Sequence, residues 1–284
     1  MPKLECDGLE LLMYDSWYDK IGALKSTVLS FDMPVVVFHL EKQIGELISY
    51  SKLDEALERM EINCALAHDI GAVKLVLHLW NGPISDKNID YNIKCFEYLD
   101  NIAKHYDLTL TVENVVCNQR DPFYYLCLLC DTYPDIKFTF DTKMADFHKQ
   151  IDLIYDPKYS HVVDHFAHLH VNDRLGEYKD WQNLRVLHVG DGCVDFNKFF
   201  GFVKKINYKG DFTTEATSFD LQTGIVNIEK VNSTVRKIRE LILKDLDEAV
   251  LETIKFTVKF NLDKDKLIHP NTIRAWNYIK SYEE

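Results

Sequence analysis

Long hydrophobic runs are absent from this sequence. No uninterrupted apolar stretch reaches the roughly 18 to 20 residues that a membrane-spanning helix requires, and the N-terminus lacks the basic and then apolar pattern of a secretory signal. We therefore expect a cytoplasmic protein that has no contact with a membrane.

Positive charge is also scarce. Lys and Arg together number 33 against 45 Asp and Glu, which gives a formal net charge of -12 at pH 7. This balance opposes long-range attraction to nucleic-acid phosphates or anionic lipid, although it does not exclude local basic patches. We expect a small molecule rather than nucleic acid as the partner.

The cysteines show no pattern of disulfide or metal-finger pairs. There are seven of them, an odd number, and they are scattered mostly through apolar runs, as reduced thiols of an intracellular core are. Cys127 and Cys130 form a Cys-x-x-Cys pair within an apolar helical stretch, and no second pair lies at zinc-finger spacing. We interpret this pair as a packed helix face rather than a redox or zinc site.

What the sequence does contain is a regular alternation of strand and helix patterns. Its 284 residues with 46% hydrophobic content suit one large α/β barrel. Helix-period segments such as Leu53–Asp69, Ile89–Tyr106 and Pro122–Tyr133 separate apolar strand candidates, which favours parallel βαβ units. The strand candidates are Leu9–Tyr14, Pro34–His39, Val73–Leu79, Leu108–Glu113, Ile136–Asp141, Phe166–Val171 and Asp211–Glu215. The predicted fold is a TIM-type (β/α) barrel.

Four of these strand candidates contain a metal-ligating residue at or near their carboxyl end. The residues are Glu113, Asp141, His170 and Glu215. Because the carboxyl ends of parallel barrel strands meet at one rim, these side chains are expected to converge there. A ligand set in which oxygen predominates indicates a site for a divalent metal ion.

The motifs around these residues resemble a known family. Thr111-Val-Glu113-Asn, Phe140-Asp141-Thr, His168-Leu-His170-Val-Asn-Asp173, Gly190-Asp-Gly192 and Thr214-Glu215 are similar to the strand-end motifs of the xylose isomerase-like barrel superfamily. That group includes sugar isomerases, ketose 3-epimerases and type IV AP endonucleases. The resemblance covers residues 1 to 220, approximately.

The resemblance implies a gap at the front of the barrel. Leu9–Tyr14 resembles the second strand of the family, and only Met1 to Asp7 precede it, so we expect the usual first strand to be missing. Such a gap would leave two unpaired strand edges, unless one poorly patterned strand has escaped notice. The predicted domains are a barrel over residues 1–220 and a C-terminal helical extension over residues 221–284. The extension, with its apolar stripe along Val231–Leu262, should pack on the barrel or on a partner subunit, which favours a homodimer.

The resemblance also implies a function. Glu113, Asp141, His170 and Glu215 resemble the single-metal set of the sugar epimerases, with Glu113 and Glu215 as the acid/base pair. The expected activity is isomerisation or epimerisation of a small sugar, sugar phosphate or polyol derivative through a metal-stabilised enediolate. The expected cofactor is one divalent ion: Mn²⁺, Zn²⁺, Co²⁺ or Mg²⁺.

Two further histidines extend the candidate site. His39 and His78 also end apolar runs, and they match positions at which the endonuclease relatives bind an additional metal. They are expected either to hold a second ion bridged by Glu113 or to bind substrate. His168 shares strand parity with His170, and we interpret it as a buried histidine below the site.

The remaining candidates concern the substrate. Five residues lie at or just beyond strand ends and are expected to contact it: Trp80, Lys143, Asn172, Asp173 and Arg174. Met144 and Val186 stand where the endonuclease relatives carry histidines, so a three-metal cluster is incomplete in this sequence. An AP-endonuclease-like phosphodiesterase and a catalytically impaired metal- or ligand-binding barrel are the alternatives.

Overall fold

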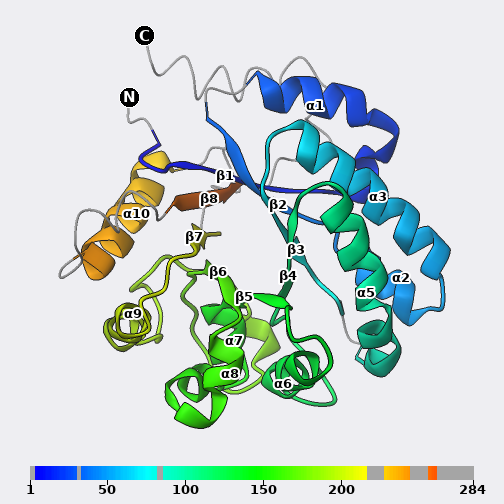
Figure 1. Ribbon diagram of the computed structural model, residues 1–284. Helices are drawn as coiled ribbons and strands as arrows, with labels where there is room; N and C mark the ends of the chain where they lie inside the picture. The colour runs from blue at the N-terminus through cyan, green and yellow to red at the C-terminus, as the bar shows by residue number, and fades with distance from the viewer. Residues whose placement is uncertain (1–3, 31–32, 82–85, 216–226, 244–254, 261–284) are drawn as a thin grey trace.

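The protein folds as a closed barrel of eight parallel strands with helices on its outside (Figure 1). The computed structural model describes residues 4–30, 33–81, 86–215, 227–243 and 255–260. Each strand pairs with its neighbours in chain order, and the last strand pairs with the first. The predicted TIM-barrel class is therefore confirmed.

The strands are short and end close to the positions that the sequence predicts. Their bounds are β1 Gly8–Leu12, β2 Val35–His39, β3 Lys74–Leu77, β4 Thr109–Glu113, β5 Lys137–Asp141, β6 Phe166–His170, β7 Asp211–Thr214 and β8 Phe256–Phe260. The first seven correspond to the seven strand candidates. Side chains along each strand alternate between the two faces of the sheet, which gives the barrel an outer and an inner set.

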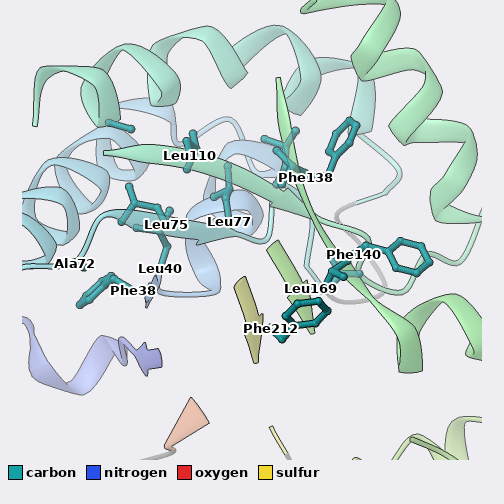
Figure 2. Packing of buried hydrophobic residues seen from close by; sticks show 14 of the residues in the cluster. Phe38, Leu40, Ala72, Leu75, Leu77, Leu110, Phe138, Phe140, Leu169 and Phe212 are labelled. Carbon is teal, nitrogen blue, oxygen red and sulfur yellow. The ribbon is translucent and has the colours of Figure 1, made fainter. Parts of the chain in front are cut away.

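The outer set of side chains is apolar and forms the core between strands and helices. Leu75 and Leu77 of β3, Phe138 and Phe140 of β5, and Phe212 of β7 are all buried in one hydrophobic cluster (Figure 2). The helices that cover this layer are α1 Ile21–Leu29, α2 Gln43–Ser49, α3 Leu53–Asp69, α5 Ile89–His105, α6 Pro122–Thr132, α7 Thr142–Phe147, α8 Ser160–Val163, α9 Phe196–Lys205 and α10 Ile228–Leu243. Short 3-10 turns lie at Asp15–Lys20, Ile151–Tyr155, Pro157–Tyr159 and Trp181–Asn183.

Most side chains of the inner set are polar, although Val37 and Val76 belong to a small separate apolar cluster. The polar interior is unusual for a barrel of this kind. At the amino end, Lys74 donates to Asp211 Oδ2 at 2.6 Å and to the Ala167 carbonyl at 2.8 Å. In the middle, Thr111 and Thr139 share a hydrogen bond of 2.6 Å between their hydroxyls. These contacts satisfy buried polar groups and leave the carboxyl end of the barrel for the ligands.

Helix ends follow local sequence signals. Pro122 occupies the first turn of α6, where its missing N–H costs nothing. Gly71 follows α3 with φ of 83°, the left-handed conformation that we expect of a residue that ends a helix. Cys127 and Cys130 of α6 are free thiols packed against the core, in agreement with the packed helix face that the sequence predicts.

The predicted gap in the barrel wall does not exist. Strand β8 lies between β7 and β1 and pairs with both in parallel, so it fills the place where the first strand of the family would lie. The expectation of a helix across Val231–Leu262 was wrong for Phe256–Phe260, which is a strand. The division at residue 220 stays a prediction, but one strand from beyond it belongs to the barrel.

Asp7, which precedes β1, binds the first residue of β8. The Asp7 carboxylate accepts a hydrogen bond of 2.8 Å from the Phe256 N–H, and the Asp7 N–H donates to the Phe256 carbonyl at 2.8 Å. Arg239 of α10 pairs with the same carboxylate at 3.0 Å. Residues from both ends of the described chain thus hold the barrel closed.

Helix α10 packs within its own chain. Val231, Val235, Ile238 and Ile242 are buried and form one apolar stripe. The final helix predicted over Asn271–Tyr282 lies outside the described residues. Among the helices that the structure describes, none has both the length and the apolar character needed to cross a membrane.

Candidate metal centre at the carboxyl ends of the strands

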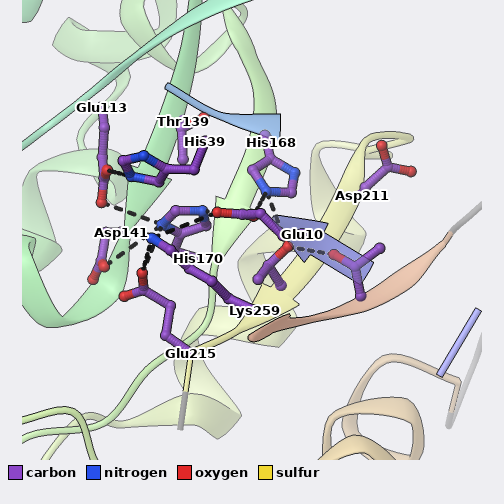
Figure 3. Close-up of polar contacts among 12 residues, drawn as sticks. Glu10, His39, Glu113, Thr139, Asp141, His168, His170, Asp211, Glu215 and Lys259 are labelled. Atoms are coloured by element: carbon purple, nitrogen blue, oxygen red, sulfur yellow. Dashed lines mark hydrogen bonds and ion pairs between the residues drawn. The ribbon is translucent and has the colours of Figure 1, made fainter. Parts of the chain in front are cut away.

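The four predicted ligands meet at one rim of the barrel (Figure 3). Candidate ligand atoms of Glu113, Asp141 and His170 all lie within 4.8 Å of one another. His170 Nδ1 lies 3.2 Å from Glu113 Oε1 and 3.9 Å from Glu215 Oε1. The sequence prediction that these residues converge is therefore correct in its geometry.

Two asparagines fix the carboxylates in this arrangement. Asn172 Nδ2 donates to Asp141 Oδ2 at 3.1 Å and to Glu215 Oε2 at 2.9 Å. Its Oδ1 also accepts the Glu215 N–H at 2.8 Å. Asn114 accepts the Asp141 N–H at 2.6 Å and donates to the Asp141 carbonyl at 3.1 Å. Asn172 thus orients the carboxylate oxygens, and Asn114 fixes the backbone of Asp141, before any ligand arrives.

The electrostatics of the cluster reflect crowded negative charge. Burial raises the pKa of Asp141 to about 7; Glu215 and Glu113 add to the increase, and Lys143 opposes it. Burial alone would also raise the pKa of Glu113, but His170 and His78 hold it well below its usual range. The cluster therefore favours additional positive charge.

Glu10 orients His170 from the side of the imidazole that is opposite to Glu113. His170 Nε2 lies 3.1 Å from Glu10 Oε2, and Glu10 is fully buried inside β1. Burial would lower the pKa of His170, but the charges of Glu10, Glu113 and Glu215 raise it well above its ordinary value. With Nε2 directed at Glu10, Nδ1 faces Glu113. A carboxylate behind an imidazole in this way is the usual support of a metal-binding histidine.

The donor set fits a divalent cation. Three carboxylates and one imidazole suit Mg²⁺, Mn²⁺ or Zn²⁺, since hard oxygen donors predominate and one nitrogen is present. The carboxylate oxygens of Glu113 contact histidine side chains, and those of Glu215 contact Asn172 and Lys259. Glu113, Asp141, His170 and Glu215 are the residues that would hold the ion.

A second group of donors shares Glu113. His78 Nε2 lies 2.7 Å and His39 Nε2 lies 3.4 Å from Glu113 Oε2. Burial lowers the pKa of His39 to about 3 and also lowers the pKa of His78, so both imidazoles are neutral and able to ligate. Within the described chain, His39 Nε2 has no hydrogen-bond partner. This group fits a second ion.

Sequence reasoning missed two charged residues of the site, Glu10 and Lys259. Lys259 of β8 is 3% exposed, forms an ion pair with Glu215 Oε1, and lies 3.6 Å from Glu10 Oε1. The sequence does contain a strand signal here, because Phe-Thr-Val-Lys-Phe alternates with a period of two. It lies, however, in the stretch Val231–Leu262, for which the sequence pattern predicts a helix. His168 is buried below the site, as predicted, with Nε2 3.1 Å from Glu10 Oε2.

The predicted substrate residues divide into two groups. Lys143 and Asn172 face the cluster, with Lys143 Nζ 3.9 Å from Glu215 Oε2. Trp80 is fully buried, and its Nε1 donates to the Val115 carbonyl at 3.1 Å, so it belongs to the core.

Asp173 and Arg174 have structural partners in the loop that follows β6. The Asp173 carboxylate accepts N–H groups of Arg174, Gly190, Gly192 and Val194. Arg174 pairs with Asp146 at 2.8 Å and is fully buried. A Cβ on Gly192 would lie 2.4 Å from Asp173 Oδ1, which explains the glycine of the Gly-Asp-Gly motif. Their contact with substrate stays a prediction.

The position of a third metal has no histidine. Asp141 caps helix α7 by accepting the Met144 N–H at 3.0 Å, and the nearby His148 has other partners. His148 Nδ1 lies 2.7 Å from Asp121 Oδ1, and its Nε2 accepts the Cys117 N–H at 3.2 Å. In the described residues, the candidate metal groups contain neither His148 nor His188.

The neutral form of His148 makes stability depend on pH. Burial lowers its pKa from 6.5 to about 4, although the Asp121 carboxylate opposes the shift. Because the folded pKa is the lower one, the stabilisation is complete above the unfolded pKa and is lost as pH falls from about 6.5 towards 4. We expect a loss on the order of 3 kcal/mol over this window. Urea unfolding of wild type and His148→Gln at several pH values measures it, and identical pH slopes would refute the assignment.

Comparisons with known proteins agree with the barrel fold. A family model described as xylose isomerase-like TIM barrel matches residues 3–241. No curated protein sequence matches the chain. The fold is similar to an L-ribulose 3-epimerase, with a TM-score of 0.61, 16% identity, and coverage of 87% of this chain and 88% of that one.

Two other solved structures are similar to the same extent. A 3-keto-D-glucoside 4-epimerase from E. coli has a TM-score of 0.57 and 16% identity, and the match covers 82% of this chain and 89% of that chain. A D-allulose 3-epimerase from Methylomonas sp., solved in complex with D-allulose, has a TM-score of 0.58 and 15% identity, with 82% and 86% covered. At these identities the likeness concerns the fold.

Proposed function

Because this chain belongs to the xylose isomerase-like TIM barrel family, we propose that it is a divalent-metal-dependent isomerase or epimerase of a small sugar or polyol derivative. The observation that supports this function most is the convergence of Glu113, Asp141 and His170 within 4.8 Å, with Glu215 beside them. The similar solved structures that are sugar epimerases suggest the reaction class, and the donor set supports metal-assisted chemistry.

The reaction requires removal of a proton from the carbon next to a carbonyl group. A divalent ion held by the four ligands would polarise the substrate carbonyl and make that proton more acidic. Glu113 ends β4, Glu215 directly follows β7, and the two provide the carboxylates that take and return the proton. Lys259 beside Glu215 helps to keep that carboxylate ionised: burial opposes ionisation, but the ammonium lowers the pKa of Glu215.

Metal content is the first test of this proposal. Protein purified without chelator is expected to contain about one divalent ion per chain, and up to two if His39, His78 and Glu113 hold a second. Elemental analysis measures this content, and His39→Gln separates the two sites because it should remove only the second ion. Failure of the wild-type protein to bind Mn²⁺, Zn²⁺, Co²⁺ or Mg²⁺ would refute the proposal.

One observation favours a second candidate, a phosphodiesterase acting at abasic DNA. The group of His39, His78 and Glu113 provides the second ion position that such an activity uses. The net charge of -12 and the absence of a histidine at Met144 weigh against it. A nicking assay on an abasic duplex, run beside a ketose panel, separates the two activities, and metal binding without either activity would favour a non-catalytic barrel.

A further inference from the structure

Three lysines surround the candidate metal centre, and they come from separate parts of the chain. Lys42 follows β2 at the start of α2, Lys143 lies in the first turn of α7, and Lys259 belongs to β8. Lys143 is 6% exposed and Lys259 is 3% exposed. Lys42 is only partly buried. Buried lysines are rare without a partner, so Lys143 and Lys259 require an explanation.

Two of the lysines flank one carboxylate. Lys259 is paired with Glu215 Oε1, whereas the Lys143 ammonium lies 3.9 Å from Glu215 Oε2. The second distance is too long for a hydrogen bond. Lys143 therefore faces the centre with a weak partner.

The positive charge of Lys42 has even weaker partners than that of Lys143. In the described part of the chain, no hydrogen bond or ion pair is found for the Lys42 ammonium group. Burial lowers its pKa; Lys259 and Lys143 also lower it, whereas Glu215 and Glu113 raise it. Lys42 lies three residues after His39, at the carboxyl end of β2, and therefore at the same rim of the barrel as the other two lysines.

The balance between carboxylates and ammonium groups explains why three lysines lie around the centre. Four carboxylates (Glu10, Glu113, Asp141 and Glu215) and three lysines (Lys42, Lys143 and Lys259) lie inside the barrel or at its mouth, so the carboxylates exceed the ammonium groups by one once His170 is neutral, the form in which it binds a metal ion. A divalent ion would reverse this balance and give the loaded site one net positive charge. A positive interior in a protein with a net charge of -12 indicates an anionic ligand.

We propose that the substrate carries a phosphate or carboxylate group that Lys42, Lys143 and Lys259 bind. This inference rests on the proposed function and narrows it to an anionic sugar derivative. The burial of Lys143 and Lys259 favours a small molecule that enters the barrel mouth over a polymer that lies across it.

The test uses three probes that share a carbon skeleton and cannot turn over. D-glucitol is neutral, D-gluconate carries a carboxylate, and D-glucitol 6-phosphate carries a phosphate. We expect calorimetric titration of the Mn²⁺-loaded full chain to show at least about tenfold tighter binding of one anionic probe than of D-glucitol. The preference should shrink as salt is raised, and the preferred probe identifies the anionic group.

Matched variants locate the binding group. Lys143→Met and Lys42→Met should each reduce the preference by about tenfold without loss of the metal ion. Lys94→Met, at an exposed position on α5, should leave it unchanged. Having two variants protects the test if one of them fails to fold.

Equal binding of all three probes, failure of both anionic probes to bind, or an unchanged preference in both lysine variants would overturn the inference. Its failure is distinguishable from failure of the proposed function. Proton exchange into a neutral ketose with equal probe binding would retain the function and remove the inference. Preferential binding of an anionic probe without metal-dependent proton exchange would retain the inference about the anionic group and remove the proposed function.

Discussion

A chain that ends after Ser218 is expected not to fold to a stable barrel. The truncation removes β8, which pairs with β7 and β1, and it removes α10 with its buried stripe of Val231, Val235, Ile238 and Ile242. The exposed strand edges and apolar surface should cause aggregation. Light scattering and circular dichroism of the purified product measure both effects.

A pair of substitutions in or beside β8 provides a gentler version of the same test. Val258 is fully buried and Lys255 is exposed. Val258→Asp should lower the free energy of unfolding by about 3 kcal/mol or more, because it buries a charge in the wall, whereas Lys255→Asp should change it by less than about 1 kcal/mol. A soluble, monomeric truncation with undiminished stability would show that β8 is dispensable.

Replacement of Glu113 by glutamine should abolish most of the activity. Glu113 contacts His39, His78 and His170 and joins both candidate ion groups, so Glu113→Gln removes a shared negative charge. We expect metal affinity to fall by about tenfold to a hundredfold and turnover by about a hundredfold to ten-thousandfold. Elemental analysis and turnover with a ketose panel measure the two effects separately.

Glu215→Gln should have a similar effect on turnover, and Glu97→Gln should have none. Glu97 is an exposed carboxylate on α5, which makes it a matched control for the substitution itself. Circular dichroism of each variant checks that the fold is retained. Wild-type turnover in either Glu113→Gln or Glu215→Gln would remove that residue from the acid/base role.

The sequence predicted the first seven strands and their ligands for a physical reason. Parallel barrel strands are apolar on the outer face, and their inner residues at the carboxyl end face the ligand. A run such as Leu108–Glu113 therefore predicts both the strand and the functional residue at its end. Glu113, Asp141 and His170 converge because β4, β5 and β6 are neighbours that pair in parallel and end at the same rim, where Asp141 pairs with His170 after a register shift between Phe138 and Thr139.

The features that the sequence did not reveal depend on contacts between distant segments. Strand β8 is five residues long, and its alternation is too short to stand out beside the helix pattern of α10. Lys259 therefore could not be placed in the site. Asp173 and Arg174 follow a ligand directly, but only the fold of their loop decides that their side chains bind the Gly190–Val194 backbone and Asp146.

The central claim is that this centre transfers a proton on a sugar with the help of a divalent ion. Its most direct test is incorporation of solvent deuterium next to the carbonyl of ketoses, followed by NMR in D₂O with Mg²⁺- or Co²⁺-loaded enzyme. The panel should include neutral and phosphorylated ketoses as well as ketose acids. We predict metal-dependent deuterium incorporation into at least one of them by the wild-type protein, and its loss in Glu113→Gln. Incorporation that persists in Glu113→Gln, or none by the metal-loaded wild type across the panel, would contradict the account.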